Sequence, residues 1–350
     1  MAKKVRVGIV GMGIGKVNGR ALDANPRGEI VAICDIIPEK MDVFEQELGR
    51  DVKKYVSYRK MCRDAEVDAV FVGTPNQVHV PVAMEAVRND KHVLCTKPLA
   101  HSGAAAAKLI PAAESSGVVN MMSLSTRFSP ACQQIGSRIA KGFFGELYYA
   151  RARSIRRSGI PDWNEGFIQA GGGAFRDMGV HVLDASWWLL GMPRPISASG
   201  VAGAKFGPKG RGYWDFRVPP KKYSKQYASD DYAGGLIRFD GGLAVQVESF
   251  WASHQPEDFQ VELFGTQAGA QVFPPKVYRT TDGFPEDTEI HVPRSARGQW
   301  DRIAAHFIDC ILDGVACRAP LRHGLIVQRM MEAVLDSGKK GKEVRVGEVK

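Results

Sequence analysis

Val5-Arg-Val-Gly-Ile-Val-Gly-Met-Gly-Ile-Gly15 is the stretch of this chain that decides its fold. A short β-branched strand runs directly into a turn with three glycines, Gly11, Gly13 and Gly15, and a helical pattern follows. Glycine lets the backbone approach a ligand closely, and amides at the following helix N-terminus point toward a phosphate group. The regular spacing of such a turn places the third glycine at position 16. Because this chain has Lys16 there, either Gly15 serves with one residue deleted or Lys16 takes that place.

Strand-like and helical patterns alternate over the first third of the chain. They occupy Val5–Val10, Ile14–Ala24, Ile30–Asp35, Pro38–Leu48, Ala69–Gly73, Val78–Arg88, His92–Cys95 and Gly103–Ser116. This alternation predicts parallel strands joined by right-handed helical crossovers, which form a doubly wound α/β sheet. We expect this domain to span residues 1–125.

The pattern changes from about Gly145 to longer strands with a two-residue period. These are Leu147–Ile155, Gly234–Asp240, Leu243–Trp251 and Gln260–Gly265. They predict a second α/β domain, residues 126–350, with a large and mainly antiparallel sheet. One long helix at about Ala174–Leu190 interrupts this sheet, and two helical patterns, Trp300–Leu312 and Leu321–Leu335, close the chain. Whether the C-terminal helix packs back onto the first domain is left open.

Composition narrows the function classes. The chain has 350 residues, of which 44% are hydrophobic, yet no apolar run is long enough to cross a bilayer, so we expect no membrane partner. The net charge of +9 comes from dispersed cations, which indicates a solvated surface and not a nucleic-acid site. Six scattered cysteines include no Cys-x-x-Cys pair, and no His cluster completes a zinc pattern. We therefore expect no metal and a reducing, cytoplasmic location.

An acidic residue supports a dinucleotide at the glycine turn. Asp35 ends the second predicted strand, where a carboxylate hydrogen-bonds the ribose hydroxyls of an adenine dinucleotide. Its charge would repel the extra phosphate of NADP, and its neighbours Ile36 and Ile37 offer no Arg to attract that phosphate. The expected cofactor is therefore NAD, with NADP disfavoured. The alternative is that Asp35 only caps the helix that starts near Pro38.

Two further loops follow buried parallel strands, where ligands bind in such sheets. The first is Gly73-Thr-Pro-Asn-Gln-Val-His79, and the second is Cys95-Thr-Lys-Pro-Leu99. Lys97 stands between an apolar strand and a proline, so its ammonium can reach a reacting oxygen, or it can extend to solvent instead. His79 begins a helix, where it can also cap or pack.

A second chemical motif lies in Gly171–Asp184, where Asp177 and His181 are four residues apart after a glycine cluster. On a helix this spacing puts both side chains on one face. A His beside an acid is suited to moving a proton at neutral pH, and glycines allow a close approach to a ligand. The alternative is that Asp177 caps a turn and His181 is a core histidine.

Together these motifs resemble the Gfo/Idh/MocA family of nicotinamide-dependent sugar and cyclitol oxidoreductases. The resemblance covers nearly the whole chain. It rests on Gly11–Gly15, Thr74-Pro75-Asn76 with His79, Lys97-Pro98, Arg127-Phe128-Ser-Pro130 and Gly171–Asp184. It implies a Rossmann domain followed by an α/β domain whose open sheet makes the interface of a homodimer or homotetramer.

The resemblance also implies residue roles. By matching position, Lys97, Asp177 and His181 correspond to the family's catalytic residues, with His181 taking the proton of a sugar or polyol hydroxyl as hydride passes to the nicotinamide. The expected cofactor contacts are Gly11, Gly13, Ile14, Gly15, Asp35, Thr74, Pro75, Asn76, His79, Thr96 and Lys97. The expected substrate contacts are Arg127, Arg157, Trp163, Asn164 and Phe175, which combine aromatic faces with polar groups.

The chain departs from the family pattern at two positions, since Thr96 replaces a common Glu and Asn18 stands where relatives often have His. The proton-transfer residues remain, so a dehydrogenase is the leading hypothesis. Two alternatives stay open. One is a redox-assisted lyase or glycosidase that recycles its NAD, and the other is a nucleotide-binding regulator without catalysis.

Overall fold

The computed structural model describes residues 3–293 and 296–348, and the chain forms two compact units. The first unit contains Met1–Ser125 and Arg297–Ile326, and the second contains Thr126–Ala296 and Val327–Glu348. The predicted domains, 1–125 and 126–350, are continuous segments, whereas each unit of the structure combines separate segments, with Arg297–Ile326 belonging to the first unit. Among the described residues, no helix combines the length and apolarity needed to cross a bilayer.

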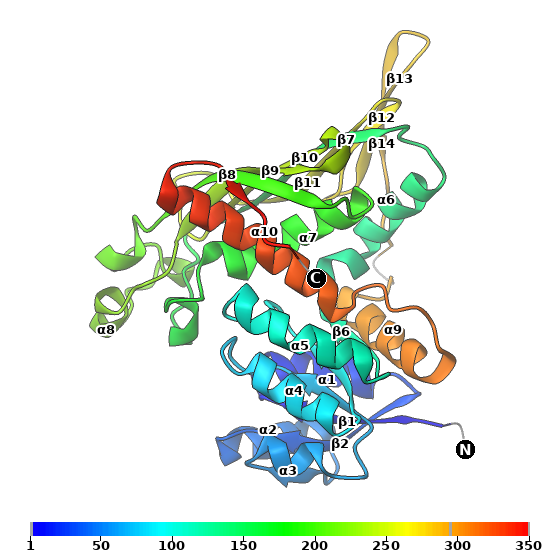
Figure 1. The fold of residues 1–350 in the computed structure, drawn as a ribbon, viewed down its shortest axis with the longest axis vertical. Coiled ribbons are helices and arrows are strands. Elements are labelled where there is room, and N and C mark those ends of the chain that lie inside the picture. The colour runs from blue at the N-terminus through cyan, green and yellow to red at the C-terminus, as the bar shows by residue number, and fades with distance from the viewer. Residues whose placement is uncertain (1–2, 294–295, 349–350) are drawn as a thin grey trace. The chain divides into compact units, whose positions relative to one another are not determined.

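The first unit is built on a six-stranded parallel sheet with strand order β3-β2-β1-β4-β5-β6 (Figure 1). Its strands are β1 (Val5–Val10), β2 (Gly28–Cys34), β3 (Lys53–Tyr55), β4 (Ala69–Val72), β5 (His92–Cys95) and β6 (Asn120–Met122). Its helices are α1 (Ile14–Asp23), α2 (Pro38–Leu48), α3 (Tyr58–Cys62), α4 (His79–Arg88), α5 (Gly103–Ser115) and α9 (Gln299–Asp313). This order is that of a doubly wound sheet, so the predicted fold class is confirmed.

The central strands are apolar because helices cover both faces of a parallel sheet. All four residues of β4 are buried, and Val7 and Ile9 on β1 are fully buried as well. The edge strand β3 was missed by the sequence pattern, because Lys53 and Lys54 are exposed and leave no apolar run to detect. Charged residues of this kind are common on edge strands, where they discourage pairing with other chains.

Helix α9 supplies apolar cover to the first unit from the far end of the chain. It contacts α1 and β1 and buries Ile303, Phe307 and Ile308 completely or nearly so. The segment after it also joins this unit, since Met122 N–H donates to Ala319 O at 2.8 Å beside β6. The first unit is therefore completed by residues that lie about 170 positions beyond its main segment, from Ser125 to Arg297.

The second unit carries a nine-stranded sheet in the order β14-β13-β12-β11-β7-β10-β9-β8-β15. The strands are β7 (Leu147–Ile155), β8 (Pro195–Gly203), β9 (Tyr232–Phe239), β10 (Ala244–Phe250), β11 (Asp258–Gly265), β12 (Ala268–Gln271), β13 (Lys276–Thr281), β14 (Phe284–Glu289) and β15 (Val344–Arg345). The helices are α6 (Pro130–Ala140), α7 (Val180–Leu189), α8 (Lys221–Lys225) and the greater part of α10 (Leu321–Lys340). Within this sheet, the β7–β10 pair is parallel and the other described pairings are antiparallel, which confirms the mainly antiparallel prediction.

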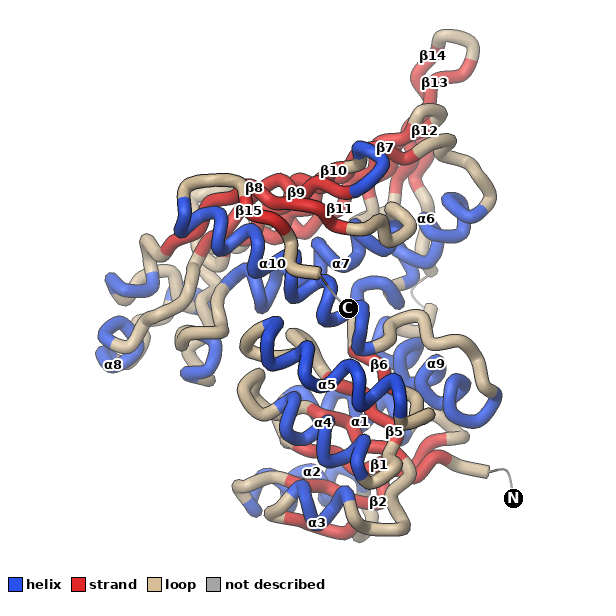
Figure 2. The backbone as a smooth tube through the Cα atoms, in the orientation of Figure 1, coloured by secondary structure: helices blue, strands red, loops and turns tan. Residues whose placement is uncertain are grey.

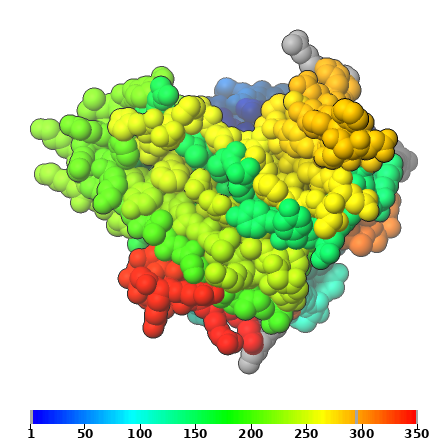
Figure 3. All heavy atoms as spheres, turned by 90° about the horizontal axis from the view of Figure 1, so that it is seen from above, coloured from blue at the N-terminus to red at the C-terminus, as the bar shows by residue number. Residues whose placement is uncertain are grey.

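Helices cover one face of this sheet, as Figure 2 shows for the second unit. Helix α7 contacts β7, β10 and β11, and along β7 the small residues Ala150, Ala152 and Ser154 are buried toward it. The alternate residues face the other way, where Arg151 and Arg153 pair with Glu262. Figure 3 looks onto that face, where atoms of the central strands lie at the surface. The sheet is thus covered on one side and open on the other within the second unit.

Candidate active site

The glycine turn after β1 is shaped by close backbone contacts. Gly11 has a φ of 91°, and a Cβ there would lie 2.6 Å from Gly73 O. A Cβ on Gly15 would lie 2.9 Å from Ile9 Cγ2, whereas one on Gly13 would meet nothing within 4 Å. Gly15 therefore makes the close contact with β1 that the third glycine of such a turn provides. The space beside Gly13 is empty of protein atoms, so a ligand can approach the backbone of the turn there.

Lys16 takes a different role from the glycines. Its ammonium lies 3.2 Å from Glu47 Oε1 on α2, at the surface. Of the two residues that could take the place of the third glycine, Gly15 packs against β1, whereas the side chain of Lys16 points to Glu47. The turn is one residue shorter than the regular pattern.

Asp35 braces the glycine turn. Its Oδ2 accepts a hydrogen bond from Met12 N–H at 2.8 Å, and its Oδ1 accepts one from Ile37 N–H at 3.0 Å. No side chain caps the N-terminus of α2, so the alternative role of Asp35 as a helix cap is not what the geometry shows. Helix α1 also begins without a side-chain cap at Gly13. Its first amides are therefore available to an anion, which is the arrangement that a pyrophosphate uses.

His79 ties the two predicted ligand loops together from beneath. Its Nδ1 lies 2.8 Å from Pro98 O and its Nε2 lies 2.6 Å from Thr74 O. The ring is fully buried, and this burial lowers its pKa while the two carbonyls favour its protonated form. With both nitrogens against protein carbonyls, His79 is placed to position the loops and not to present a nitrogen to a ligand.

The loops present polar groups at the carboxyl ends of β4 and β5. Thr74 Oγ1 is buried and has no hydrogen-bond partner among the described residues. Thr96 is also buried, with its amide donating to Val72 O, and half-buried Lys97 follows it through a cis Lys97-Pro98 bond. The first unit therefore offers an uncapped helix N-terminus, an acid beside it and an orphaned hydroxyl. This donor set fits a dinucleotide with a ribose and a pyrophosphate.

In the second unit, Asp177 and His181 lie on one continuous helical segment that is not regular. Residues Phe175–Gly179 form a π-helical turn, and α7 follows directly from Val180. A π turn widens the helix, so the four-residue spacing does not place the two side chains as the predicted α-helix would. Such turns are frequent at functional sites because they redirect side chains that a regular helix would stack.

Asp177 is fixed by two groups that the sequence reading did not assign to the site. Trp251 Nε1 donates to Asp177 Oδ2 at 3.0 Å, and Arg156 interacts with the carboxylate through its charge. The Arg156 guanidinium lies 4.8 Å above the ring of Trp214, and its burial lowers the pKa of the guanidinium. Asp177 is therefore held by an indole and a cation on one side of the helix.

His181 is half-buried and is oriented by Thr126. The hydroxyl Oγ1 of Thr126 lies 3.3 Å from His181 Nδ1. If Nδ1 carries the proton and Thr126 accepts it, Nε2 is the basic nitrogen of the ring. His181 is thus held through one nitrogen by a residue at the start of the second unit, and the alternative of a fully buried core histidine does not apply.

The glycine cluster before the helix makes room for protein, contrary to its predicted role beside a ligand. A Cβ on Gly173 would lie 2.1 Å from Asp230 Oδ1, and one on Gly172 would lie 2.0 Å from Phe167 O. Asp230 Oδ2 accepts a hydrogen bond from Phe175 N–H at 2.9 Å. Burial raises the pKa of Asp230 to about 6. The glycines therefore admit a buried carboxyl that anchors the start of the helical segment.

An aromatic group surrounds the residues near Asp177. Trp163 is 57% exposed, and its ring meets Trp214 edge-on at 5.4 Å and Phe167 at 6.1 Å. Phe167 in turn meets Trp251 at 6.4 Å. Asn164 is exposed and uses its Oδ1 to accept the Gly166 amide. Exposed indole faces beside a polar group are the usual lining of a sugar site.

Three predicted substrate contacts are placed elsewhere. Arg127 is 1% exposed and forms a two-point ion pair with buried Asp184, at 2.7 Å and 2.5 Å. Phe175 is fully buried in the core. Arg157 is exposed and its Nε lies 3.4 Å from Gln255 O, whereas its neighbour Arg156 approaches Asp177. In this structure Arg127 and Phe175 are enclosed by protein, and Arg156 is the arginine whose charge acts on Asp177.

Asp230, Trp251 and Arg156 are the residues that the sequence reading missed as parts of this site. Asp230 and Trp251 lie more than 50 positions from Asp177, and Arg156 is one of several neighbouring arginines, so sequence spacing did not single out any of them. A weak signal was present at Asp230 and Asp231, where two acids stand together at the start of an apolar strand. Buried carboxyls in such a place need backbone donors, which marks them as anchors.

The comparisons with known proteins agree with this architecture. A family model described as an oxidoreductase family with an NAD-binding Rossmann fold matches residues 5–124. A model of the Gfo/Idh/MocA C-terminal domain matches residues 132–271. The two matches together span most of the chain and fall on the two sheets.

Relatives of known activity are similar over much of the chain. D-glucoside 3-dehydrogenase of Escherichia coli (strain K12) is 27% identical over 352 residues, which cover 98% of this chain and 97% of that protein. Levoglucosan dehydrogenase of Pseudarthrobacter phenanthrenivorans is 26% identical, covering 77% of this chain and 74% of that protein. A solved structure of levoglucosan dehydrogenase with NADH and levoglucosan has a TM-score of 0.87 at 21% identity, covering 99% of this chain and 100% of that chain. At that identity the likeness shows the fold.

Proposed function

Because the chain belongs to the Gfo/Idh/MocA oxidoreductase family, we propose that it moves a hydride between NAD and a secondary hydroxyl of a sugar, glycoside or inositol. The observation that carries this proposal is the arrangement of Asp177 and His181 on one helical segment, each oriented by a specific partner. Two relatives named as dehydrogenases of glucosides and levoglucosan support the substrate class.

His181 takes the hydroxyl proton in the proposed reaction. With Nδ1 directed at Thr126, we assign Nε2 as the atom that accepts the proton in oxidation and returns it in reduction. Bound NAD supplies the hydride acceptor. Asp177, itself held by Trp251 and Arg156, orients a neighbouring hydroxyl or the imidazole. Lys97 donates a hydrogen bond to the oxygen on which negative charge develops.

The first unit binds the dinucleotide in this proposal. Amides at the start of α1 hold the pyrophosphate, Asp35 holds the adenosine ribose and thereby selects NAD over NADP, and Thr74 uses its orphaned hydroxyl. His79 keeps the two loops in place beneath the nucleotide. The remaining proposed contacts are Gly11, Gly13, Ile14, Gly15, Pro75, Asn76, Thr96 and Lys97.

Trp163, Asn164 and Arg156 are the proposed substrate contacts of the second unit. The exposed indole of Trp163 can stack on the apolar face of a sugar ring. Asn164 lies beside it, and the guanidinium of Arg156 can donate to sugar hydroxyls. This set replaces the original one, from which Arg127, Phe175 and Arg157 drop out.

A substrate panel tests the proposal. The purified protein is mixed with NAD and, separately, with glucosides, anhydrosugars and inositols, and the absorbance of reduced nicotinamide is followed. At least one sugar or cyclitol should produce NADH, and the same reaction with NADP should be slower. Product formed without net NADH would instead establish the redox-assisted lyase. Tight nucleotide binding without turnover of any compound would establish the regulator.

We also propose that two copies associate through the open face of the nine-stranded sheet. On this face Tyr232 stacks on Phe250 at 5.7 Å, and Arg151 lies over Phe264 at 5.2 Å. Aromatic and Arg side chains of this kind are enriched where proteins associate. Leu236 lies on the same face by strand alternation, so Leu236→Arg should lower the mass measured by sedimentation. A wild-type monomer at assay concentration would refute the interface.

A further inference from the structure

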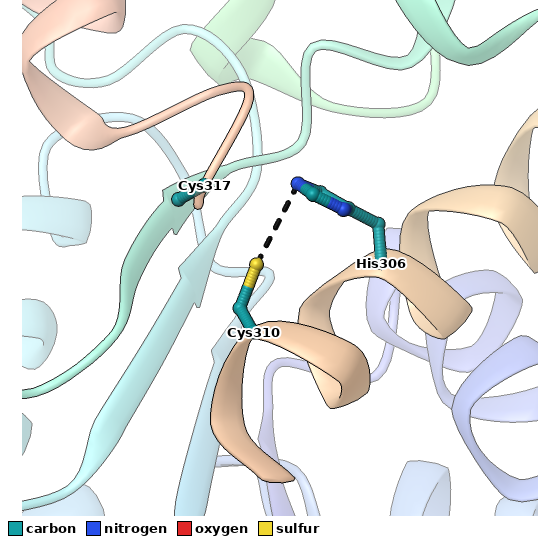
Figure 4. Close-up of side chains that lie close together, drawn as sticks. All are labelled: His306, Cys310 and Cys317. Atoms are coloured by element: carbon teal, nitrogen blue, oxygen red, sulfur yellow. Dashed lines mark hydrogen bonds between the residues drawn. The ribbon is translucent and has the colours of Figure 1, made fainter. Parts of the chain in front are cut away.

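Helix α9 and the segment that follows it bring together one histidine and two cysteines in the first unit. His306 and Cys310 are four residues apart on α9, so they share one face of the helix, and Cys317 approaches them from the returning chain (Figure 4). Their donor atoms all lie within 4.8 Å of one another. His306 and Cys310 are each 5% exposed, and Cys317 is half-buried. These residues take no part in the proposed reaction.

The fold holds Cys317 in this place by contacts on both sides of it. Helix α9 ends at Gly314, whose φ of 66° is left-handed and lets the chain turn back. Beyond Cys317, Ala319 O accepts the Met122 amide beside β6. The two cysteines are seven positions apart, one on α9 and one in the segment after it, and the turn at Gly314 and the contact with β6 bring them together.

The imidazole of His306 is in the form that binds a metal. Arg318 N–H donates to His306 Nε2 at 2.9 Å, so Nε2 carries a lone pair and no proton. Cys310 Sγ lies 3.5 Å from the same nitrogen. A tetrahedral zinc ion takes sulfur at about 2.3 Å and imidazole nitrogen at about 2.0–2.1 Å, which separates such donors by about 3.5 Å. Metal binding would exchange the Arg318 amide bond for a nitrogen–metal bond.

We propose that His306, Cys310 and Cys317 form a structural site for a thiophilic divalent metal ion of the zinc class. The two cysteines bind as thiolates, whose charges offset that of the ion, and a water or other small ligand completes the coordination. Asp309 and Arg318 act on the Cys310 thiol with charges of opposite sign. The bound ion would join the second half of α9 to the end of β6.

This site differs from what the sequence predicted, because no Cys-x-x-Cys pair or His cluster marks it. It also differs from a simple dithiol. A disulfide between Cys310 and Cys317 would use only the two sulfurs and leave His306 Nε2 as the acceptor of the Arg318 amide, whereas a metal ion uses all three donors. The convergence of an imidazole nitrogen and two sulfurs from separate turns is what favours the ion.

Cobalt(II) titration of the full-length protein tests the site. Thiols are first reduced and metal is removed, and cobalt is then added while thiolate-to-cobalt charge-transfer absorption is recorded. The wild-type protein should bind one cobalt ion with this absorption, and zinc should displace it. Zinc should also raise the melting temperature of the apoprotein, because it binds the folded state.

Cys317→Ser is the decisive variant, because half-buried Cys317 is the ligand whose change disturbs packing least. This variant should lose the thiolate-to-cobalt absorption and the zinc-dependent rise in melting temperature. Its affinity for zinc should fall by more than roughly 100-fold, the upper limit for losing a residue that only hydrogen-bonds a metal ligand. Cys132→Ser, a buried cysteine of the second unit, should behave as wild type. Cys310→Ser removes a second proposed ligand and should have the same effect as Cys317→Ser. Circular dichroism of the metal-free proteins verifies that each variant folds.

Two results would overturn the proposal. One is a wild-type protein that, with its thiols fully reduced, shows no thiolate-to-cobalt band. The other is a Cys317→Ser protein that binds cobalt with the same absorption as wild type. Neither result depends on turnover of a sugar, so this test is independent of the proposed function.

Discussion

At the scale of single residues, Asp177 and His181 differ in how they are held. Asp177 accepts from the indole of Trp251 and faces the charge of Arg156, whereas His181 has one nitrogen against the hydroxyl of Thr126. An acid held by an indole donor beside a guanidinium has a fixed direction, which suits an orienting role. The Thr126 contact fixes the orientation of the His181 ring, which a proton-transfer role would need. The division of labour follows from these partners.

His181→Ala should lower kcat by about 10²–10⁴-fold, the range typical of a lost general base. The affinity for NAD should stay unchanged, because the proposed nucleotide contacts belong to the first unit. Steady-state rates and a fluorescence titration of NADH measure the two quantities. His254→Ala removes an exposed histidine of the same unit and should keep the wild-type rate. A His181→Ala enzyme of full activity would remove His181 from the mechanism.

Arg127→Met should lower the free energy of unfolding by about 3–5 kcal/mol, because it leaves the buried Asp184 carboxylate without its partner. Urea denaturation measures this loss. The double variant Arg127→Met with Asp184→Leu removes both charges and should recover much of the stability. Arg194→Met, at an exposed ion pair, should change stability by less than about 1 kcal/mol. Equal effects of the two single Arg variants would contradict the assignment.

At the scale of elements, the segment from Gly171 to Leu189 departs from the regular helix that its sequence predicts. A π turn replaces the first turns of the helix, and the glycines before it accommodate the Asp230 carboxyl and a backbone oxygen. The π turn and the anchor occur together, because Asp230 holds the Phe175 amide where the turn begins. The segment that bears Asp177 and His181 is therefore anchored by an acid some 50 residues away along the chain, from Asp177 to Asp230.

Asp230 makes the stability of this element depend on pH. Its folded pKa of about 6 lies above the ordinary 3.8, through burial and the nearby Asp231 charge, while Arg176 and the Phe175 amide oppose the shift. The folded state therefore gains a proton before the unfolded state as the pH falls from about 6 to about 4. Above pH 6 the folded state holds the buried Asp230 carboxylate in its charged form, which lowers the free energy of unfolding. As the pH falls from about 6 to about 4, protonation of this carboxyl in the folded state raises the free energy of unfolding again.

Unfolding of wild type and Asp230→Asn across this window tests the shift. Asparagine keeps an acceptor for the Phe175 amide and carries no charge, so its stability should not follow this titration. Wild type should gain on the order of 2–3 kcal/mol relative to Asp230→Asn between pH 7 and pH 4. Asp51→Asn, at an exposed position, should track wild type at every pH. Parallel pH profiles for wild type and Asp230→Asn would show that Asp230 ionises normally.

At the scale of the whole molecule, each unit is assembled from two separate parts of the chain. The doubly wound sheet is completed by α9, whose apolar face covers α1 and β1. The nine-stranded sheet is completed by β15, which pairs with β8 after the chain has passed through α10. Neither unit can therefore be cut from the sequence as a single segment without losing part of its core.

A fragment of residues 1–125 should fail to fold stably, because it lacks the apolar side chains that α9 buries, among them Ile303, Phe307 and Ile308. The same fragment joined through a flexible linker to residues 297–326 should regain a cooperative thermal transition and NAD binding. Circular dichroism and nucleotide titration measure both properties. Cooperative unfolding of the 1–125 fragment alone would show that α9 is dispensable.

The sequence by itself determined the class of each sheet and the order of its chemical motifs. A parallel sheet needs uninterrupted apolar strands and a glycine turn at its first crossover, and a half-covered sheet needs alternating residues, so both appear as local periodicities in the printed sequence. Lys97, Asp177 and His181 stand in short contiguous motifs, and their catalytic roles remain predictions implied by the family resemblance.

Only the tertiary structure decided which side chains meet. Arg127 and Phe175 looked like ligand contacts in sequence, yet burial gave Arg127 to Asp184 and Phe175 to the core. Trp251, just after the end of β10 and 74 positions from Asp177, donates a hydrogen bond to the Asp177 carboxylate. Burial and long-range pairing depend on which distant segments of the chain pack together, and the local periodicity of the sequence does not contain that information. For the same reason the spacing in the sequence did not predict that Cys317 would lie beside His306 and Cys310 of α9.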